Sequence, residues 1–261
     1  MTSIPTPGLV GHRGAAALEP ENTLRSFRRA AALGVAQMEC DVHLSADGAD
    51  VVIHDATVDR TAQPDSPRRT GTVAALTRAQ LDEVRVGEGE AIPSLSQVLD
   101  ACVRPDGTRI PLLVEVKAVE AAQLVARILT ARFSAAQFEE REGAPVHVIS
   151  FHAEALRVVR EIAPHLPLLL TCTQTTPEFW ASAEELGVAT IGVRIADARA
   201  ADIDRARALG ADVNLWTARS DVELRRALEL GCDTITVDDP IWAADVIAQK
   251  LSTRQAVPQP S

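Results

Sequence analysis

The sequence predicts an α/β protein whose single domain is a (β/α)₈ TIM barrel, with a small hairpin and a loop excursion after the second strand. Short apolar runs, typical of buried parallel strands, alternate along the chain with amphipathic stretches rich in alanine, leucine and arginine. Eight such strand–helix units favour a closed barrel over an open sheet. A length of 261 residues fits one barrel domain, and no linker divides it.

The expected strands are the continuous apolar runs at residues 9–11, 37–42, 112–117, 146–151, 168–171, 190–193, 212–216 and 234–237. The stretches with helical periodicity lie at residues 23–33, 95–103, 121–133, 153–162, 177–186, 200–209, 221–230 and 240–250. Gly34, Gly187, Gly210 and Gly231 each follow such a stretch, as a helix C-cap would. We therefore expect one domain over residues 1–261, with a core at about 9–247 and a flexible tail at 252–261.

One apolar run breaks the alternation. Residues 51–53 follow the second strand across a turn-like segment at 45–50, and they read as an antiparallel strand that closes a hairpin on the barrel rim. This strand would carry His54 back to the barrel mouth. Residues 55–93, which are interrupted by prolines and glycines, then form a long excursion before the second barrel helix.

Composition narrows the class of protein. Hydrophobic residues make up 46% of the chain, which is enough for a full core. The net charge of −10, without a basic stripe, argues against nucleic-acid binding. The cysteines form no CxxC pair, which indicates reduced residues in a cytoplasmic protein. Residues 1–8 show no signal peptide, and no stretch approaches the roughly 18 apolar residues of a membrane span.

Charged side chains stand at the ends of the second and third strands, where barrel enzymes carry out their chemistry. Glu39 and Asp41 are two residues apart, as are Glu115 and Lys117, so each pair points to one face of its strand. In a barrel that face can be the interior, where an uncompensated carboxylate is costly. Taken pair by pair, these residues also fit a structural salt-bridge network.

Three converging carboxylates would repel one another and raise one another's pKa values. A single divalent cation that prefers oxygen ligands, Mg²⁺ or Ca²⁺, removes that repulsion and leaves positions for phosphate oxygens. Zinc fits less well, because the acids outnumber any plausible cysteine or histidine ligands. The acid set Glu39, Asp41 and Glu115 is therefore expected to bind a metal.

Two histidines frame this acid set. His12 ends the first strand between Gly11 and Gly14, and His54 follows the hairpin strand. Cleavage of a phosphodiester needs one group that takes a proton and one that gives a proton, and two imidazoles supply both. Arg13 and Lys117 would neutralise the non-bridging phosphate oxygens. The planar guanidinium of Arg13 would offer paired hydrogen bonds, and the ammonium of Lys117 would act as a point charge.

The ends of the later strands carry fewer candidate functional residues. Trp216 could form an apolar wall for the alcohol part of a substrate, although an aromatic residue there is as often simply packing. Arg194 is an additional cation without an evident role. The other histidines are not accompanied in the sequence by further candidate site residues, and we interpret them as structural or surface residues: His43, His147, His152 and His165.

The ordered motifs resemble those of the glycerophosphodiester phosphodiesterase family. They are Gly11-His12-Arg13-Gly14, Pro20-Glu21-Asn22-Thr23, Glu39-Cys40-Asp41-Val42, Asp47-Gly48, His54-Asp55, Thr57-Val58-Asp59-Arg60-Thr61, Ile92-Pro93-Ser94-Leu95, Glu115-Val116-Lys117, Ser150-Phe151, Asn214-Leu215-Trp216-Thr217 and Gly231-Cys232-Asp233-Thr234-Ile235. They span nearly the whole chain, and the ordered set is highly specific although the first motif alone is weak.

The resemblance implies one site with the metal ligands Glu39, Asp41 and Glu115, the general acid/base pair His12 and His54, and the phosphate-binding residues Arg13 and Lys117. It also implies a small glycerophosphodiester substrate. A glycerol hydroxyl would attack the phosphorus, and water would open the cyclic phosphate to give glycerol 3-phosphate and a free alcohol. The strands at 168–171 and 190–193 depart from the family pattern, so the head group stays open, and Arg194 would favour an anionic one.

Three other interpretations remain. A lysophospholipase D-like or sphingomyelinase-like barrel would act on lipid and would want an exposed apolar loop, whereas residues 55–89 are mostly polar. A non-catalytic phosphodiester-binding barrel would be expected to have lost a histidine or an acid. An aldolase or isomerase that uses Lys117 as a Schiff-base amine leaves the three acids unexplained. The sequence does not indicate an oligomeric state.

Overall fold

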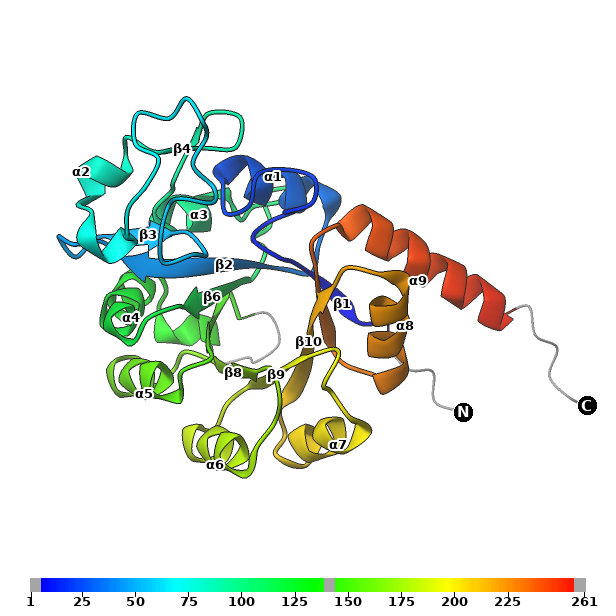
Figure 1. Ribbon diagram of the computed structural model, residues 1–261. Coiled ribbons are helices and arrows are strands. Elements are labelled where there is room, and N and C mark those ends of the chain that lie inside the picture. The colour runs from blue at the N-terminus through cyan, green and yellow to red at the C-terminus, as the bar shows by residue number, and fades with distance from the viewer. Residues whose placement is uncertain (1–5, 139–143, 256–261) are drawn as a thin grey trace, which may run out of the picture.

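The computed structural model describes the backbone of residues 6–138 and 144–255, and side chains as far as residue 250. Eight parallel strands form a closed barrel with helices around it, which confirms the predicted fold class (Figure 1). In spatial order they are β1 (Gly8–Gly11), β11 (Thr234–Val237), β10 (Asp212–Ala218), β9 (Thr190–Arg194), β8 (Leu168–Cys172), β7 (Val146–Ser150), β6 (Leu112–Val116) and β2 (Gln37–Leu44). Pairing of Val10 with Gln37 closes the barrel between β1 and β2.

The helices that cover the barrel match the predicted ones to within a few residues at their ends. They are α1 (Leu24–Leu33), α3 (Leu95–Ala101), α4 (Ala122–Arg132), α5 (Ala153–Ile162), α6 (Pro177–Leu186), α7 (Ala200–Ala208), α8 (Asp221–Leu230) and α9 (Pro240–Gln255). Local chemistry sets several of these ends. The Thr23 side chain accepts a hydrogen bond from the Ser26 backbone at the start of α1, and Gly34 ends that helix with φ 74°.

The apolar side chains form two separate layers. Residues on the outer face of the strands pack against the helices and make the main core. Inside the barrel, Val10, Leu113, Ile149 and Leu169 form a small apolar plug. Leu113 lies two residues before Glu115 on the same strand and faces the same way, so this plug forms the floor beneath the acidic residues.

The predicted hairpin is present. Strand β3 (Asp50–Val52) pairs antiparallel with the end of β2, with Val42 opposite Val52, and it delivers His54 to the barrel mouth. The excursion that follows contains η1 (Val73–Ala75), α2 (Arg78–Leu81) and a two-stranded sheet of β4 (Arg85–Val86) and β5 (Glu90–Ala91). It also has a core of its own, which includes Val58, Leu81 and Ile92. The remaining short elements are η2 (Val119–Ala121) and η3 (Ala135–Phe138).

The C-terminal end differs from the expectation. Helix α9 continues to Gln255, so its last turn includes the first four residues of the segment at 252–261 that the polar sequence placed in a flexible tail. Residues 256–261 and 1–5 lie outside the described part, so the rest of the predicted tail and most of the region examined for a signal peptide are untested. Among the described helices, none combines the length and the apolar character that crossing a membrane requires.

Candidate active site

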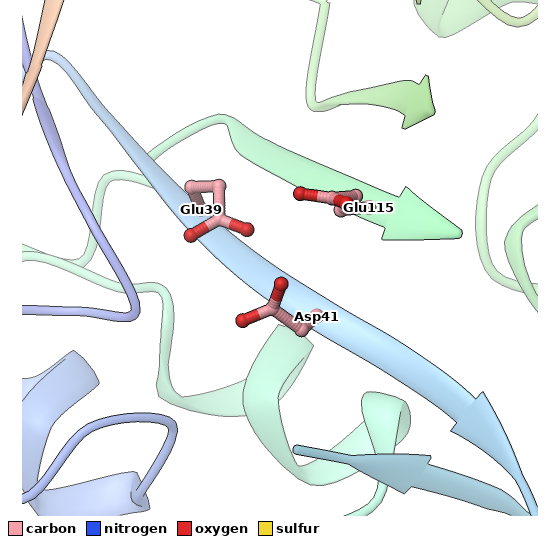
Figure 2. Close-up of side chains that lie close together, drawn as sticks. All are labelled: Glu39, Asp41 and Glu115. Atoms are coloured by element: carbon pink, nitrogen blue, oxygen red, sulfur yellow. The ribbon is translucent and has the colours of Figure 1, made fainter. Parts of the chain in front are cut away.

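Three carboxylates meet at the carboxyl end of the barrel. Glu39 and Asp41 project from β2, and Glu115 projects toward them from the neighbouring strand β6 (Figure 2). Asp41 is paired in register with Glu115, and one oxygen from each of the three carboxylates lies within 4.8 Å of the others. The two-residue spacing that predicted a shared face therefore places these side chains inside the barrel. The three residues are buried, and this is an arrangement that could hold a metal ion.

The electrostatics of this acid cluster are unfavourable without a cation. Burial and the negative charge of Asp41 raise the pKa of Glu39 well above its usual range, and they raise the pKa of Glu115 to about 7. Burial also acts on Asp41, but Lys117 and Arg13 outweigh it and lower the pKa of this residue. One oxygen of Glu39, Oε1, is buried and has no hydrogen-bond partner. The acid cluster thus contains unused ligand capacity and a mutual repulsion that a divalent cation would remove.

The two predicted cations lie against these acids. Lys117 Nζ is 2.9 Å from Glu115 Oε1 and 3.3 Å from Asp41 Oδ1. Arg13 Nε is 3.3 Å from Asp41 Oδ2, and the Arg13 backbone N–H donates to Glu39 Oε2 at 3.0 Å. Both side chains also line the pocket at the barrel mouth, beside Glu39 and Glu115 of the acid cluster.

His12 is held by a residue from the other end of the chain. Its Nδ1 is 2.5 Å from Oδ1 of Asp238, which directly follows β11, and Arg219 Nε donates to the other oxygen of Asp238 at 2.5 Å. The second ring nitrogen, Nε2, is 3.9 Å from Glu39 Oε2. Burial lowers the pKa of His12, against the opposing effect of Asp238. This arrangement leaves Nε2 available at the acid cluster.

His54 is held in the same way by its neighbour in sequence. His54 Nδ1 is 2.6 Å from Asp55 Oδ1, and Arg60 Nε donates to Asp55 Oδ2 at 2.6 Å. The His54 side chain is 34% exposed, against 13% for His12. His43, which the sequence left among the structural histidines, contacts the His54 backbone carbonyl through Nε2 at 3.1 Å. Both predicted acid/base histidines therefore present an imidazole at the same mouth.

One pocket connects these groups. It is lined by both histidines, both predicted phosphate-binding cations, Glu39 and Glu115, and by a second set from the later strands: Ile149, Phe151, Thr171, Asn214, Trp216, Thr217, Arg219 and Thr236. Trp216 lines this pocket, with Phe151 packed edge-on against it at 5.3 Å between ring centroids. Asp41 lies beneath the pocket and is 1% exposed.

Arg194 departs from the expectation. Its side chain is 48% exposed, its Nε bonds to Asp197 Oδ2 at 2.5 Å, and it is not among the residues that line the pocket. Arg194 is the last residue of β9, so its backbone lies at the expected end of the barrel. The chain then turns at once, because the Asp197 N–H bonds to the Arg194 carbonyl, and the Arg194 guanidinium pairs with the Asp197 carboxylate.

Several residues that contact the site residues are only weakly indicated by the sequence. Asn22 donates to Asp41 Oδ2 at 2.8 Å, and Glu21 accepts from Arg13 at 2.9 Å. Both belong to the Pro20-Glu21-Asn22-Thr23 motif, which is part of the family resemblance, but no regular spacing along the sequence predicts a role for either residue. Asp238 directly follows the strand at 234–237, but no sequence rule pairs it with His12, which is 226 positions away.

Comparisons with known proteins agree with this geometry. A family model described as the glycerophosphoryl diester phosphodiesterase family matches residues 12–241. A glycerophosphodiester phosphodiesterase of Caldanaerobacter subterraneus subsp. tengcongensis is 30% identical over 240 residues, which cover 89% of this chain and 94% of that protein.

Two solved structures share the fold. An Oleispira antarctica phosphodiesterase in complex with the product sn-glycerol-3-phosphate has a TM-score of 0.78 at 21% identity, covering 93% of this chain and 97% of that one. A glycerophosphodiester phosphodiesterase of Parabacteroides distasonis has a TM-score of 0.74 at 22% identity, covering 94% and 98%. The family match and the sequence relative show that this chain belongs to the glycerophosphoryl diester phosphodiesterase family of phosphoric diester hydrolases.

Proposed function

We propose that the protein hydrolyses small glycerophosphodiesters to glycerol 3-phosphate and an alcohol, with one divalent cation, Mg²⁺ or Ca²⁺, and two acid/base histidines. The observation that carries the proposal is that His12 and His54 reach the same pocket as the acid cluster from different segments of the chain. The product bound to the Oleispira antarctica relative is consistent with this substrate class.

The residues present fit a divalent cation. Glu39, Asp41 and Glu115 would hold it, because they offer oxygen ligands within reach of one another and because the unpartnered Glu39 Oε1 has no other use. When bound, the cation would neutralise charge on the phosphate oxygens and polarise the phosphorus. Arg13 and Lys117 would then add their positive charges to the same oxygens from the pocket wall.

The histidines would move the protons. One imidazole takes the proton of the attacking glycerol hydroxyl while the other gives a proton to the departing alcohol, which leaves a cyclic phosphate. The roles then reverse, as the second histidine takes a proton from water and the first returns one to the glycerol oxygen. Each ring is restored after one turnover, so no additional acid or base is needed.

The alternatives fit the structure less well. The apolar residues of the excursion pack into its own core, so this segment offers little apolar surface to a lipid. A binding-only barrel would not need both imidazoles at the pocket to be oriented by a carboxylate at Nδ1. For the Schiff-base alternative, Lys117 would need to be neutral, whereas Asp41 and Glu115 overcome the effect of burial and raise its pKa.

A cytoplasmic location is part of the proposal. All four cysteines are free thiols, and burial raises the pKa of Cys102 to about 12 and of Cys232 to about 12, which makes them unreactive. Such thiols suit a reducing compartment. The partner we propose is a small-molecule substrate, with neither a nucleic acid nor a stable insertion into a membrane.

The proposal is tested by product identification. Glycerophosphocholine, glycerophosphoethanolamine, glycerophosphoglycerol and a lysophospholipid are each incubated with the metal-loaded protein, and glycerol 3-phosphate is measured. We expect release from the three water-soluble diesters. Faster turnover of the lysophospholipid would instead support the lipid-directed alternative, and turnover of none would contradict the proposal.

Metal affinity should depend on pH. Because Glu39 and Glu115 have raised pKa values in the metal-free protein, binding must displace protons from them. We expect affinity for Mg²⁺ or Ca²⁺ to fall as pH decreases through about 7, by about tenfold per pH unit for each proton displaced. Calorimetric titrations at pH 6, 7 and 8 measure this. An affinity that is independent of pH would show that the carboxylates are already ionised.

Replacing Asp238 should impair turnover more than substrate binding. The Asp238→Asn variant keeps the shape but not the charge that orients His12, so we expect kcat to fall by about 10–100-fold, the usual effect of losing such a partner. The matched variant Asp239→Asn changes the next residue and should keep its rate. Equal rates in wild type and Asp238→Asn would show that His12 needs no such partner.

Arg194 should have little influence on substrate choice. Its position outside the pocket leads us to expect that Arg194→Ala changes kcat/KM by less than about twofold for both cationic and anionic head groups. Kinetics with glycerophosphocholine and with an anionic diester give the comparison. If Arg194→Ala selectively loses activity toward the anionic diester, Arg194 has the role in substrate choice that the sequence suggested.

A further inference from the structure

Arg60, at the start of the excursion, links two segments that contribute to the pocket. Besides its bond to Asp55, the guanidinium donates from Nη1 to Glu21 Oε2 at 2.8 Å and from Nη2 to Glu21 Oε1 at 2.7 Å. Glu21 belongs to the loop between β1 and α1, 39 positions earlier. The fork geometry of arginine allows this two-sided contact, which lysine could not make.

Glu21 connects Arg60 to the acid cluster through Arg13. Glu21 Oε1, which accepts from Arg60 Nη2, also accepts from Arg13 Nη1 at 2.9 Å, and Arg13 contacts Asp41 and Glu39. A continuous chain of charged contacts therefore runs from His54 to the acid cluster. Its members, in order, are His54, Asp55, Arg60, Glu21, Arg13 and Asp41.

The loop between β1 and α1 needs such support. Arg13 and Asn22 have φ angles of 50° and 56°, in the left-handed region that residues with a side chain seldom adopt. Strained residues of this kind persist when surrounding contacts fix them, and they concentrate at functional sites. Here the Asn22 N–H bonds to the Arg13 carbonyl, and Glu21 lies between Arg60 and Arg13.

We propose that Glu21 and Arg60 are positioning residues, and that the excursion serves to hold His54 and Arg13 in register with the acid cluster. The proposal rests on the proposed function, in which both of those residues act on the substrate. Ion pairs as exposed as that of Arg60 contribute little to stability, so positioning is the larger expected effect. In support, Arg60 Nε holds Asp55 Oδ2 at 2.6 Å, which leaves Asp55 Oδ1 to accept from His54 Nδ1 at 2.6 Å.

Steady-state kinetics of Arg60→Gln and Glu21→Gln, singly and together, test the proposal. We expect each variant to lower kcat by about tenfold and to change KM by less than about twofold, and the double variant to lose no more than the worse single one. Arg60→Lys should keep the fold and the charge but not restore kcat. The control is Arg68→Gln, which breaks the Arg68–Glu83 pair within the same excursion and should keep the wild-type rate.

Three results would overturn the inference while leaving the proposed function intact: a wild-type kcat in Arg60→Gln, losses that multiply in the double variant, or full recovery in Arg60→Lys. A ring-nitrogen NMR spectrum of His54 gives a readout independent of turnover. The proton on Nδ1 should give a slowly exchanging signal in wild type and Arg68→Gln and should exchange rapidly in Arg60→Gln. An unchanged signal in Arg60→Gln contradicts the inference even if no glycerophosphodiester is turned over.

Discussion

Replacing His12 or His54 with alanine is expected to lower kcat for glycerophosphodiester hydrolysis by about 10²–10⁴-fold in each case, the usual contribution of a positioned acid or base. Each step of the proposed reaction uses both imidazoles, so the loss of either blocks the cycle. Because the two groups act as a unit, the double variant should be little worse than the worse single variant. Release of glycerol 3-phosphate under saturating substrate measures all three.

The matched control is His165→Ala, at a histidine that lines a separate groove with Arg160 and Pro167 away from the acid cluster. Its kcat should stay close to wild type. Circular dichroism and thermal unfolding should show that all the variants fold. A near-normal rate in either His12→Ala or His54→Ala would contradict the assignment of that residue as an acid or base.

The Glu39→Gln substitution is expected to separate stability from function. Glutamine can still accept the Arg13 backbone N–H through its carbonyl oxygen, but it has no carboxyl group whose ionised form is destabilised by burial and by Asp41, which raise the pKa of Glu39. We therefore expect the metal-free variant to have a higher Tm than metal-free wild type. Metal binding and turnover should both fall by more than about 100-fold, because a charged ligand is lost.

Thermal unfolding with EDTA and with added Mg²⁺ or Ca²⁺ measures both halves of this prediction. Wild type should gain Tm with the metal, as any protein does with a ligand that binds only the folded state, and the variant should gain almost none. A variant that is less stable without metal and responds to metal normally would show that Glu39 is a structural acid and not a ligand.

The strands and most of the helices could be predicted because their signals are local. A buried parallel strand is an apolar run, and a helix ends where glycine or a capping residue allows it, as at Gly34. The hairpin was equally accessible, since Gly48 marks its turn and the strand periodicity resumes after it. The excursion was harder, because its elements are two to four residues long and its core is assembled from scattered residues.

The acid cluster followed from the two-residue period of a strand, which fixes the face on which Glu39 and Asp41 lie. The direction of a long side chain beyond a strand end follows from no such rule. Arg194 sits on the expected rim, but its guanidinium pairs with Asp197 and does not line the pocket, and only the structure shows this. The Asp238 contact to His12 was equally inaccessible, because closure of the barrel alone brings β1 beside β11.

The most direct test of the central claim is the release of glycerol 3-phosphate from glycerophosphocholine by the wild-type protein before EDTA treatment, after it, and after restoring Mg²⁺ or Ca²⁺. We predict turnover that EDTA abolishes and that one of the two cations restores. Turnover that persists in EDTA would contradict the role of Glu39, Asp41 and Glu115 as the ligands of a catalytic metal.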